Sequence, residues 1–100
     1  MKKYKYLLME AKAKFLGTCD RVRKTQEGEK LWQDMMHSKK EIRESEFLKI
    51  VNVKDILDEG ESWNEYKQNA KQQGDPIKYY KSDNNIYFFQ TAGFEFMWRK

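Results

Sequence analysis

Tyr79–Trp98, which reads YYKSDNNIYFFQTAGFEFMW, decides the fold of this chain. Its large apolar residues alternate with other side chains, and this alternation is typical of β-strands. Ser-Asp-Asn-Asn and Thr-Ala-Gly interrupt the pattern, and Asn, Asp and Gly tolerate the positive φ that tight hairpin turns need. Working outward from this stretch, the pattern predicts strands over residues 77–81, 86–90 and 94–98, arranged as an antiparallel meander.

Helical patterns precede the meander. An apolar spacing of three and four residues predicts a helix over residues 4–16, with a strand over residues 3–9 as the alternative. A second helix is predicted over residues 26–40, because its apolar residues fall on one stripe. That stripe consists of Leu31, Trp32, Met35 and Met36.

Two further segments precede the strands. Residues 46–58 fit a helix or helical turns capped by Ser45, although a β-branched run within them also suits a strand. Residues 62–73 have the clearer helical signal, because Ser62 followed three residues later by Glu65 is a capping box.

Length and composition indicate one folded domain, residues 1–100. The charged share of 36% would favour disorder in a chain with few large apolar side chains, but 15% of the residues are aromatic. A few aromatic rings can build a small core, because each buries a large area. We therefore predict an α+β fold with three or four N-terminal helices packed on a C-terminal three-stranded antiparallel meander.

Turn lengths decide which strand residues share a face of the sheet. A four-residue first turn and a three-residue second turn give a core face of Ile77, Tyr79, Ile86, Phe88, Phe94, Phe96 and Trp98. The other face is then unusually apolar for a solvent face, and we expect it to be a contact patch. The patch consists of Lys78, Tyr80, Tyr87, Phe89, Glu95, Met97 and Arg99. It would be lost if helices covered both faces, or if a two-residue second turn moved Tyr87 and Phe89 to the core side.

The net charge of +4 is unevenly distributed. Residues 1–24 have a net charge of +6, and a basic segment can attract phosphate groups. Its basic residues are Lys2, Lys3, Lys5, Lys12, Lys14, Arg21, Arg23 and Lys24. Residues 54–65 have a net charge of −4, and an acidic segment can attract a basic protein surface. Its candidate contact residues are Asp55, Asp58, Glu59 and Glu61. Either run also fits an ordinary solvated surface.

The residues of common catalytic and metal sites are scarce. Cys19 and His37 are the single Cys and the single His, which make neither a zinc site nor a convincing nucleophile pair. Phosphate-loop, dinucleotide-binding and hydrolase motifs are absent from the sequence. We therefore predict a protein that is no enzyme and has no cofactor or metal. A lone Cys, a short N-terminal apolar run and no membrane-length apolar stretch predict a cytoplasmic location.

Two functions fit these features. The first is a protein-binding module that docks on a larger protein and regulates or inhibits it through the contact patch and the acidic residues. Small size and a composition rich in Lys and Asn suit a phage or mobile-element accessory protein, whose target could be a nucleic-acid enzyme. The alternative is a nucleic-acid-binding protein, in which the basic residues neutralise phosphates and Tyr80, Tyr87 and Phe89 stack on bases. A free sheet edge at residues 77–81 or 94–98 would also permit a homodimer.

Overall fold

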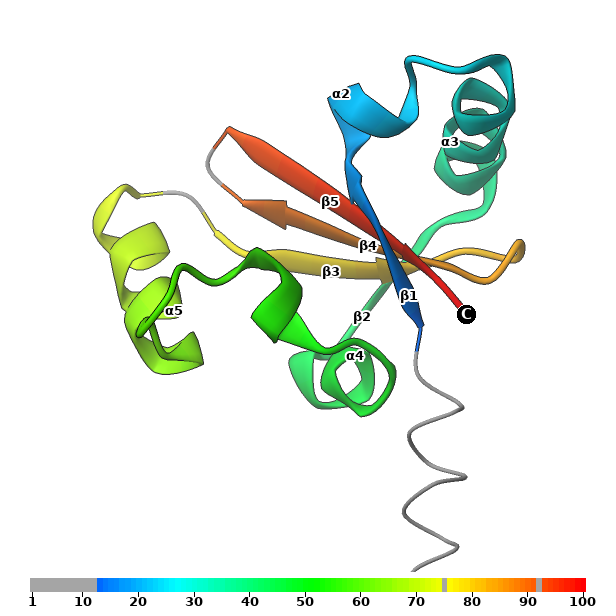
Figure 1. Cartoon of the computed structure of the whole chain (residues 1–100). Helices are drawn as coiled ribbons and strands as arrows, with labels where there is room; N and C mark the ends of the chain where they lie inside the picture. Colours follow the sequence, from blue (N-terminus) through cyan, green and yellow to red (C-terminus); the bar gives the residue numbers. More distant parts are fainter. Residues whose placement is uncertain (1–12, 75, 92) are drawn as a thin grey trace, which may run out of the picture.

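A computed structural model describes residues 13–74, 76–91 and 93–100. It confirms the α+β class and shows one antiparallel sheet of five strands, in the order β1-β5-β4-β3-β2 (Figure 1). The strands are β1 (Lys14–Thr18), β2 (Lys40–Ile42), β3 (Lys78–Lys81), β4 (Ile86–Thr91) and β5 (Phe94–Arg99). The helices are α2 (Cys19–Val22), α3 (Gln26–Ser38), α4 (Glu44–Ile50) and α5 (Trp63–Gln72), with a 3-10 turn, η1 (Val53–Ile56).

Two strands from the N-terminal half extend the C-terminal meander on both sides. β1 pairs with β5, and β2 pairs with β3. β1 occupies the end of the helix expected over residues 4–16, so that prediction is wrong from Lys14 onward; residues 4–12 lie outside the described residues. Because β3 and β5 are inner strands, the free edges expected at 77–81 and 94–98 do not exist, and the homodimer predicted through them loses its basis.

The second and third predicted helices are confirmed with different limits. α3 ends at Ser38, and Lys40 belongs to β2. α4 and η1 confirm helical turns within residues 46–58. The expected cap at Ser45 is wrong, because α4 begins at Glu44, two residues earlier than the apolar spacing suggests. Its N-cap is Arg43, which makes no capping hydrogen bond through its side chain.

The capping box at the start of α5 is confirmed. The Ser62 hydroxyl accepts a hydrogen bond from the Glu65 N–H at 3.1 Å, and the Glu65 carboxylate accepts one from the Ser62 N–H at 3.0 Å. After the helix, Gly74 adopts a φ of +82°, a conformation that glycine adopts without a Cβ penalty. The helix therefore begins and ends where local sequence signals place it.

Both turns of the meander are one residue shorter than expected. As a result, each side chain of β4 lies on the opposite face of the sheet from the one expected. The Ser82 N–H donates to the Ile86 carbonyl at 2.9 Å, so only three residues form the first turn. Thr91 pairs with Phe94, so only two positions form the second turn. A shift of one residue moves every side chain of a strand to the opposite face. The predicted core face is therefore wrong for β4.

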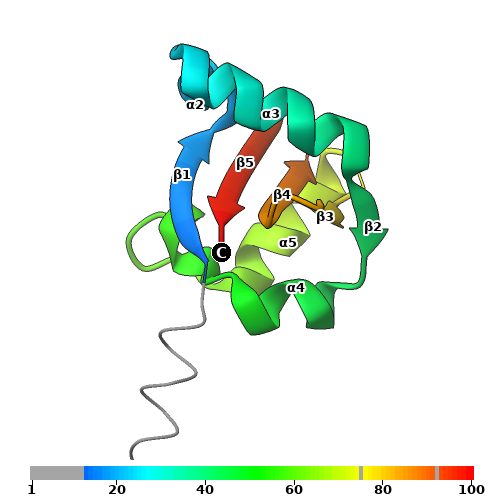
Figure 2. The same cartoon turned by 90° about the vertical axis from the view of Figure 1, so that its right-hand side faces the viewer.

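Helices cover both faces of the sheet, with α3 along one side and α4 along the other (Figure 2). Successive residues of β4 alternate between two cores. Tyr87 and Phe89 pack in the core that contains Phe47 of α4, and Ile86 and Phe88 pack in the core that contains Met35 of α3. The Phe47 ring lies 5.0–6.3 Å from four other aromatic rings. They are Tyr79, Tyr87, Phe89 and Trp98. The aromatic stretch that opens the sequence is thus mainly core.

Candidate functional site

The predicted contact patch on the sheet is wrong, because its central residues are buried. Tyr87, Phe89 and Met97 are 3%, 0% and 0% exposed. Tyr80 is half-buried against Phe88, with ring centroids 5.6 Å apart. α3 covers this side of β4 and the α4 layer covers the other, which leaves no open aromatic face at the centre of the sheet.

The charged residues expected at the rim of that patch lie far apart. Lys78 pairs with Gln90 at one end of β4, whereas Arg99 pairs with Ile86 at its other end. These positions are four residue steps apart along β4, which corresponds to about 13 Å. Both side chains are exposed, and Glu95 is exposed as well. Glu95 also pairs with Gln90, so it lies at the Lys78 end of β4 and away from Arg99.

The described basic residues proposed for nucleic-acid binding lie in two separate places. Lys2, Lys3, Lys5 and Lys12 lie outside the described residues. Lys14 begins β1, whereas Arg21, Arg23 and Lys24 follow the other end of that strand, about 13 Å away by the usual strand rise. All four of the described residues are exposed. The stacking half of this hypothesis fails with the patch, because Tyr87 and Phe89 are core residues.

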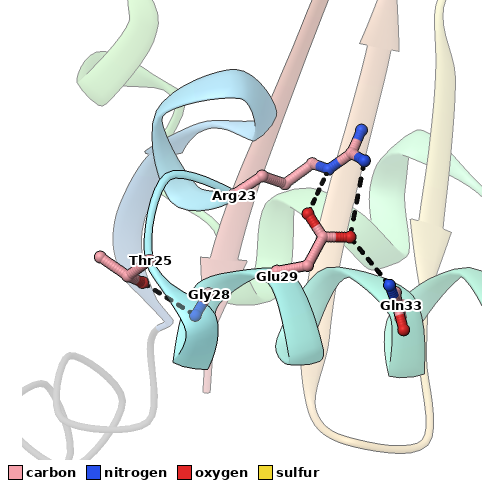
Figure 3. A network of polar contacts seen from close by, with 5 residues as sticks. All are labelled: Arg23, Thr25, Gly28, Glu29 and Gln33. Carbon is pink, nitrogen blue, oxygen red and sulfur yellow. Dashed lines mark hydrogen bonds and ion pairs between the residues drawn. The ribbon is translucent and has the colours of Figure 1, made fainter.

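Arg23 already has protein partners (Figure 3). Its Nε donates to Glu29 Oε1 at 2.8 Å, and Gln33 donates to the same carboxylate at 2.9 Å. The guanidinium lies 3.8 Å from the centre of the Trp32 ring. The Glu29 hydrogen bond raises the pKa of Arg23, and the reciprocal bond lowers the pKa of Glu29. This network fastens α3 to the turn before it.

The acidic segment borders a concave site. A groove of about 560 Å³ lies between η1 and the start of α5. It is lined by Asn52, Val53, Lys54, Leu57, Asp58, Glu59, Gly60, Glu61, Ser62 and Trp63. The lining therefore contributes the carboxylates of Asp58, Glu59 and Glu61 and the ammonium group of Lys54. Among the described residues, the groove thus has a net negative charge.

Local hydrogen bonds fix the shape of the groove. Asn52 caps η1, because its side-chain oxygen accepts from the Lys54 N–H at 3.1 Å. The Glu61 N–H donates to the Asp58 carbonyl at 3.0 Å, and the Asp58 N–H donates to the Glu61 carboxylate at 3.1 Å. Gly60 completes this tight turn with a φ of +80°. The capping box then starts α5 at the far wall.

Trp63 forms a fixed apolar wall of the groove. Its indole N–H donates to Glu44 at 3.0 Å, and its ring stacks on Tyr66 with centroids 5.6 Å apart. Lys67 donates to the same Glu44 carboxylate at 2.9 Å. Burial raises the pKa of Glu44, but these hydrogen bonds outweigh burial and lower it overall. Glu44 of α4 therefore holds Trp63 of α5 in place.

The acidic residues divide into two roles. Asp58 and Glu59 are exposed, and Glu61 is half-buried at the groove wall. Asp55 does not line the groove: its carboxylate accepts from the buried Trp98 indole N–H at 3.1 Å. Burial raises the pKa of Tyr66, and the nearby Glu61 and Asp58 carboxylates raise it further. The negative electrostatic field of the groove carboxylates therefore reaches the hydroxyl of Tyr66.

The remaining candidates for chemistry show no assembled site. Cys19 is buried, and burial together with Glu95 and Asp20 raises its pKa to about 12, so its thiol stays protonated at neutral pH. Within the described residues, no group of three or more His, Cys, Asp or Glu side chains could hold a metal ion. No helix in that part of the chain is long and apolar enough to cross a membrane.

Comparison of the chain with protein-family models, with curated proteins and with solved structures finds no match. The site must therefore be interpreted from its own geometry and charge.

The sequence identified the acidic half of the groove but missed its apolar half. Asp58, Glu59 and Glu61 are among the candidate contact residues predicted from the sequence, whereas Trp63 is not. The sequence does contain a local signal for the apolar wall, because a Trp in the first turn of a predicted helix directly follows the acidic run. Leu57 and Val53 carry no such signal, since only the path of η1 places them beside Trp63.

Proposed function

We propose that this chain is a small non-enzymatic protein-binding module that docks on a larger protein and regulates or inhibits it. The observation that carries the proposal is the acidic groove, which combines exposed carboxylates with a fixed apolar wall. Aromatic anchors beside a polar rim are typical of protein interfaces. A rigid wall also lowers the entropic cost of binding.

The groove favours a partner segment that is basic and carries an apolar anchor. Lys or Arg side chains of the partner would face Asp58 and Glu59, and an apolar side chain would pack on Trp63. Electrostatic complementarity of this kind accelerates association and selects against acidic partners. Proteins that handle nucleic acids present basic surfaces, so a nucleic-acid enzyme is one partner class with suitable chemistry.

Direct nucleic-acid binding has weaker support from the described residues. The acidic groove would repel a phosphate backbone, and the aromatic residues expected to stack on bases are buried. The exposed basic residues around α2 are the remaining support for this alternative.

Charge reversal in the groove tests the proposal. Asp58→Lys combined with Glu59→Lys should weaken binding of a Lys-rich peptide containing one Leu by about tenfold or more, because attraction becomes repulsion. Titration calorimetry with the full chain measures this change. The matched control is Glu27→Lys combined with Asp34→Lys, which makes the same charge change on exposed positions of α3.

Three results would separate the hypotheses. Weakened binding in the groove variant but not in the α3 control supports the groove. Equal weakening in both variants indicates attraction to net charge alone and contradicts a specific groove. If nucleic acid instead binds the wild-type chain at low salt and is released at moderate salt, the nucleic-acid alternative takes precedence.

A further inference from the structure

Phe94 is the most exposed large apolar residue in the described part of the chain. It is 58% exposed, whereas Met36 of α3 is 38% exposed. The Phe94 ring stacks on the Phe96 ring with centroids 6.2 Å apart and planes 7° apart, and Phe96 is itself only half-buried. These two residues, which we call the aromatic pair, therefore present apolar surface at the start of β5.

The aromatic pair adjoins the elements that wall the acidic groove. Phe96 packs against the same core as Val53 and Trp63, which both line the groove. The Phe96 ring lies 6.1 Å from the Phe89 ring, which in turn lies 5.9 Å from the Trp63 ring. Neighbouring aromatic rings thus lead along one face of the sheet from the groove wall to the exposed ring of Phe94.

The backbone beneath the aromatic pair is already paired within the sheet. Phe96 lies opposite Phe89 of β4 on one side and opposite Thr18 of β1 on the other. A partner strand therefore cannot pair with β5 at Phe96, and a ligand must be held there through side chains. A helix suits such a surface, because its own backbone hydrogen bonds are internal and it offers one apolar face.

We infer that the aromatic pair and the acidic groove form one docking surface, and that its ligand is a basic amphipathic helix of a partner protein. The inference deepens the proposed function and rests on it, because the groove is common to both. Apolar side chains of the helix would pack on Phe94 and Phe96, and its Lys or Arg side chains would face Asp58 and Glu59.

The two halves of this surface would contribute differently to binding. Covering an exposed aromatic ring removes apolar area from water and slows dissociation. The groove carboxylates would instead accelerate association, and salt would weaken their effect. The same carboxylates would repel an anionic lipid surface, which favours a protein ligand over a membrane.

A pair of peptides tests the inference on the full chain by titration calorimetry. Both have about 18 residues of Lys and Leu; one places Leu at spacings of three and four residues, and the other scrambles the same composition. The wild type should bind the amphipathic peptide more tightly than the scrambled one. Phe94→Ala should weaken binding of the amphipathic peptide about tenfold, because it removes the apolar anchor. Equal affinity for the two peptides would overturn the inference.

Met36→Ala is the matched control, because it removes the exposed apolar side chain of α3. It should leave the affinity for the amphipathic peptide unchanged, and urea denaturation checks that both variants remain folded. Normal binding by folded Phe94→Ala, or equal weakening by both substitutions, would overturn the inference.

Amide signals of the wild type locate the bound peptide. The amphipathic peptide should shift the signals of Phe94, Phe96, Asp58 and Glu59 with one common affinity, and should leave that of Met36 unchanged. Shifts confined to the groove would overturn the inference. Self-association of the chain that Phe94→Ala abolishes would replace the helix by a second copy, and binding of phosphatidylglycerol vesicles that Phe94→Ala abolishes would replace it by lipid.

The groove variant, Asp58→Lys combined with Glu59→Lys, separates failure of this inference from failure of the proposed function. Weakened binding in the groove variant but not in Phe94→Ala leaves the proposed function intact and overturns the inference. If Phe94→Ala alone weakens binding, the groove is not the binding site, and both the proposed function and the joint surface fail. Weakening in both variants supports one surface.

Discussion

At the scale of single residues, Gly28 is the position where α3 most closely approaches the preceding turn. A Cβ at this position would lie 1.7 Å from the Val22 carbonyl oxygen, a main-chain atom with little room to move. By its helix propensity alone, a glycine in the first turn would only weaken the helix by roughly 1 kcal/mol. We predict that Gly28→Ala lowers the free energy of unfolding by about 1–3 kcal/mol or more, as overpacking does elsewhere. Equilibrium urea denaturation measures this loss.

Lys30→Ala is the control for that substitution. Lys30 is exposed in the same helix, and surface substitutions usually change stability by less than about 0.5 kcal/mol. If Gly28→Ala were as stable as Lys30→Ala, the close approach of the Val22 carbonyl to α3 would be contradicted.

Phe89 and Phe94 provide a matched pair for the question of core or contact surface. Phe89 is 0% exposed, whereas Phe94 is 58% exposed on the next strand. We predict that Phe89→Ala costs about 3–5 kcal/mol of stability, because it removes a large buried ring. Phe94→Ala should cost much less. Denaturation of the two variants compares them directly, and similar losses would mean that β4 is not the shared centre of both cores.

At the scale of elements, the sequence predicted those that have their own local signals. The capping box at Ser62 sets the start of α5, and alternation sets the three C-terminal strands. β1 and β2 carry no such signal, because a five-residue strand containing Gly17 and a three-residue strand form by pairing with β5 and β3. The length of the first turn was missed for a similar reason: Ser82 continues the pairing of β3 instead of joining the turn. The two-residue second turn agrees with the alternative that the sequence left open.

The contact between α4 and α5 makes a pH-dependent contribution to stability. Burial raises the pKa of Glu44, and the hydrogen bonds from Trp63 and Lys67 lower it by more. The folded-state pKa is therefore below the ordinary value of about 4.3. Stability from this contact is present above the ordinary pKa and is lost as pH falls through the folded value. We predict that the free energy of unfolding decreases more steeply between about pH 5 and pH 3 in the wild type than after Glu44→Gln.

Glu27→Gln is the charge control for this measurement, since it removes one exposed carboxylate from α3. Chemical denaturation over a pH series gives the slope for each chain. If the Glu44→Gln chain kept the full slope of the wild type, the hydrogen bonds to Trp63 and Lys67 would contribute nothing to stability in this range.

At the scale of the whole molecule, the candidate site was half predictable. A run of acidic residues is visible in any sequence, so Asp58, Glu59 and Glu61 could be named in advance. These residues line a groove only because α4, η1 and α5 meet around Trp63. That meeting is a result of tertiary packing, so a local sequence pattern does not predict it. The surface predicted from the aromatic residues of β4 is wrong, because helices cover both faces of the sheet and bury these residues in two cores.

These two cores should unfold together, because one strand builds both. Ile86 and Phe88 enter the core under α3, while Tyr87 and Phe89 enter the core under α4. A domain of this size is expected to unfold in one cooperative step. We predict that Phe89→Ala, which removes a ring only from the α4 side, lowers amide hydrogen-exchange protection equally around Met35 in α3 and around Phe47 in α4. Lost protection around Phe47 alone would show that the two layers open separately and that β4 does not couple them.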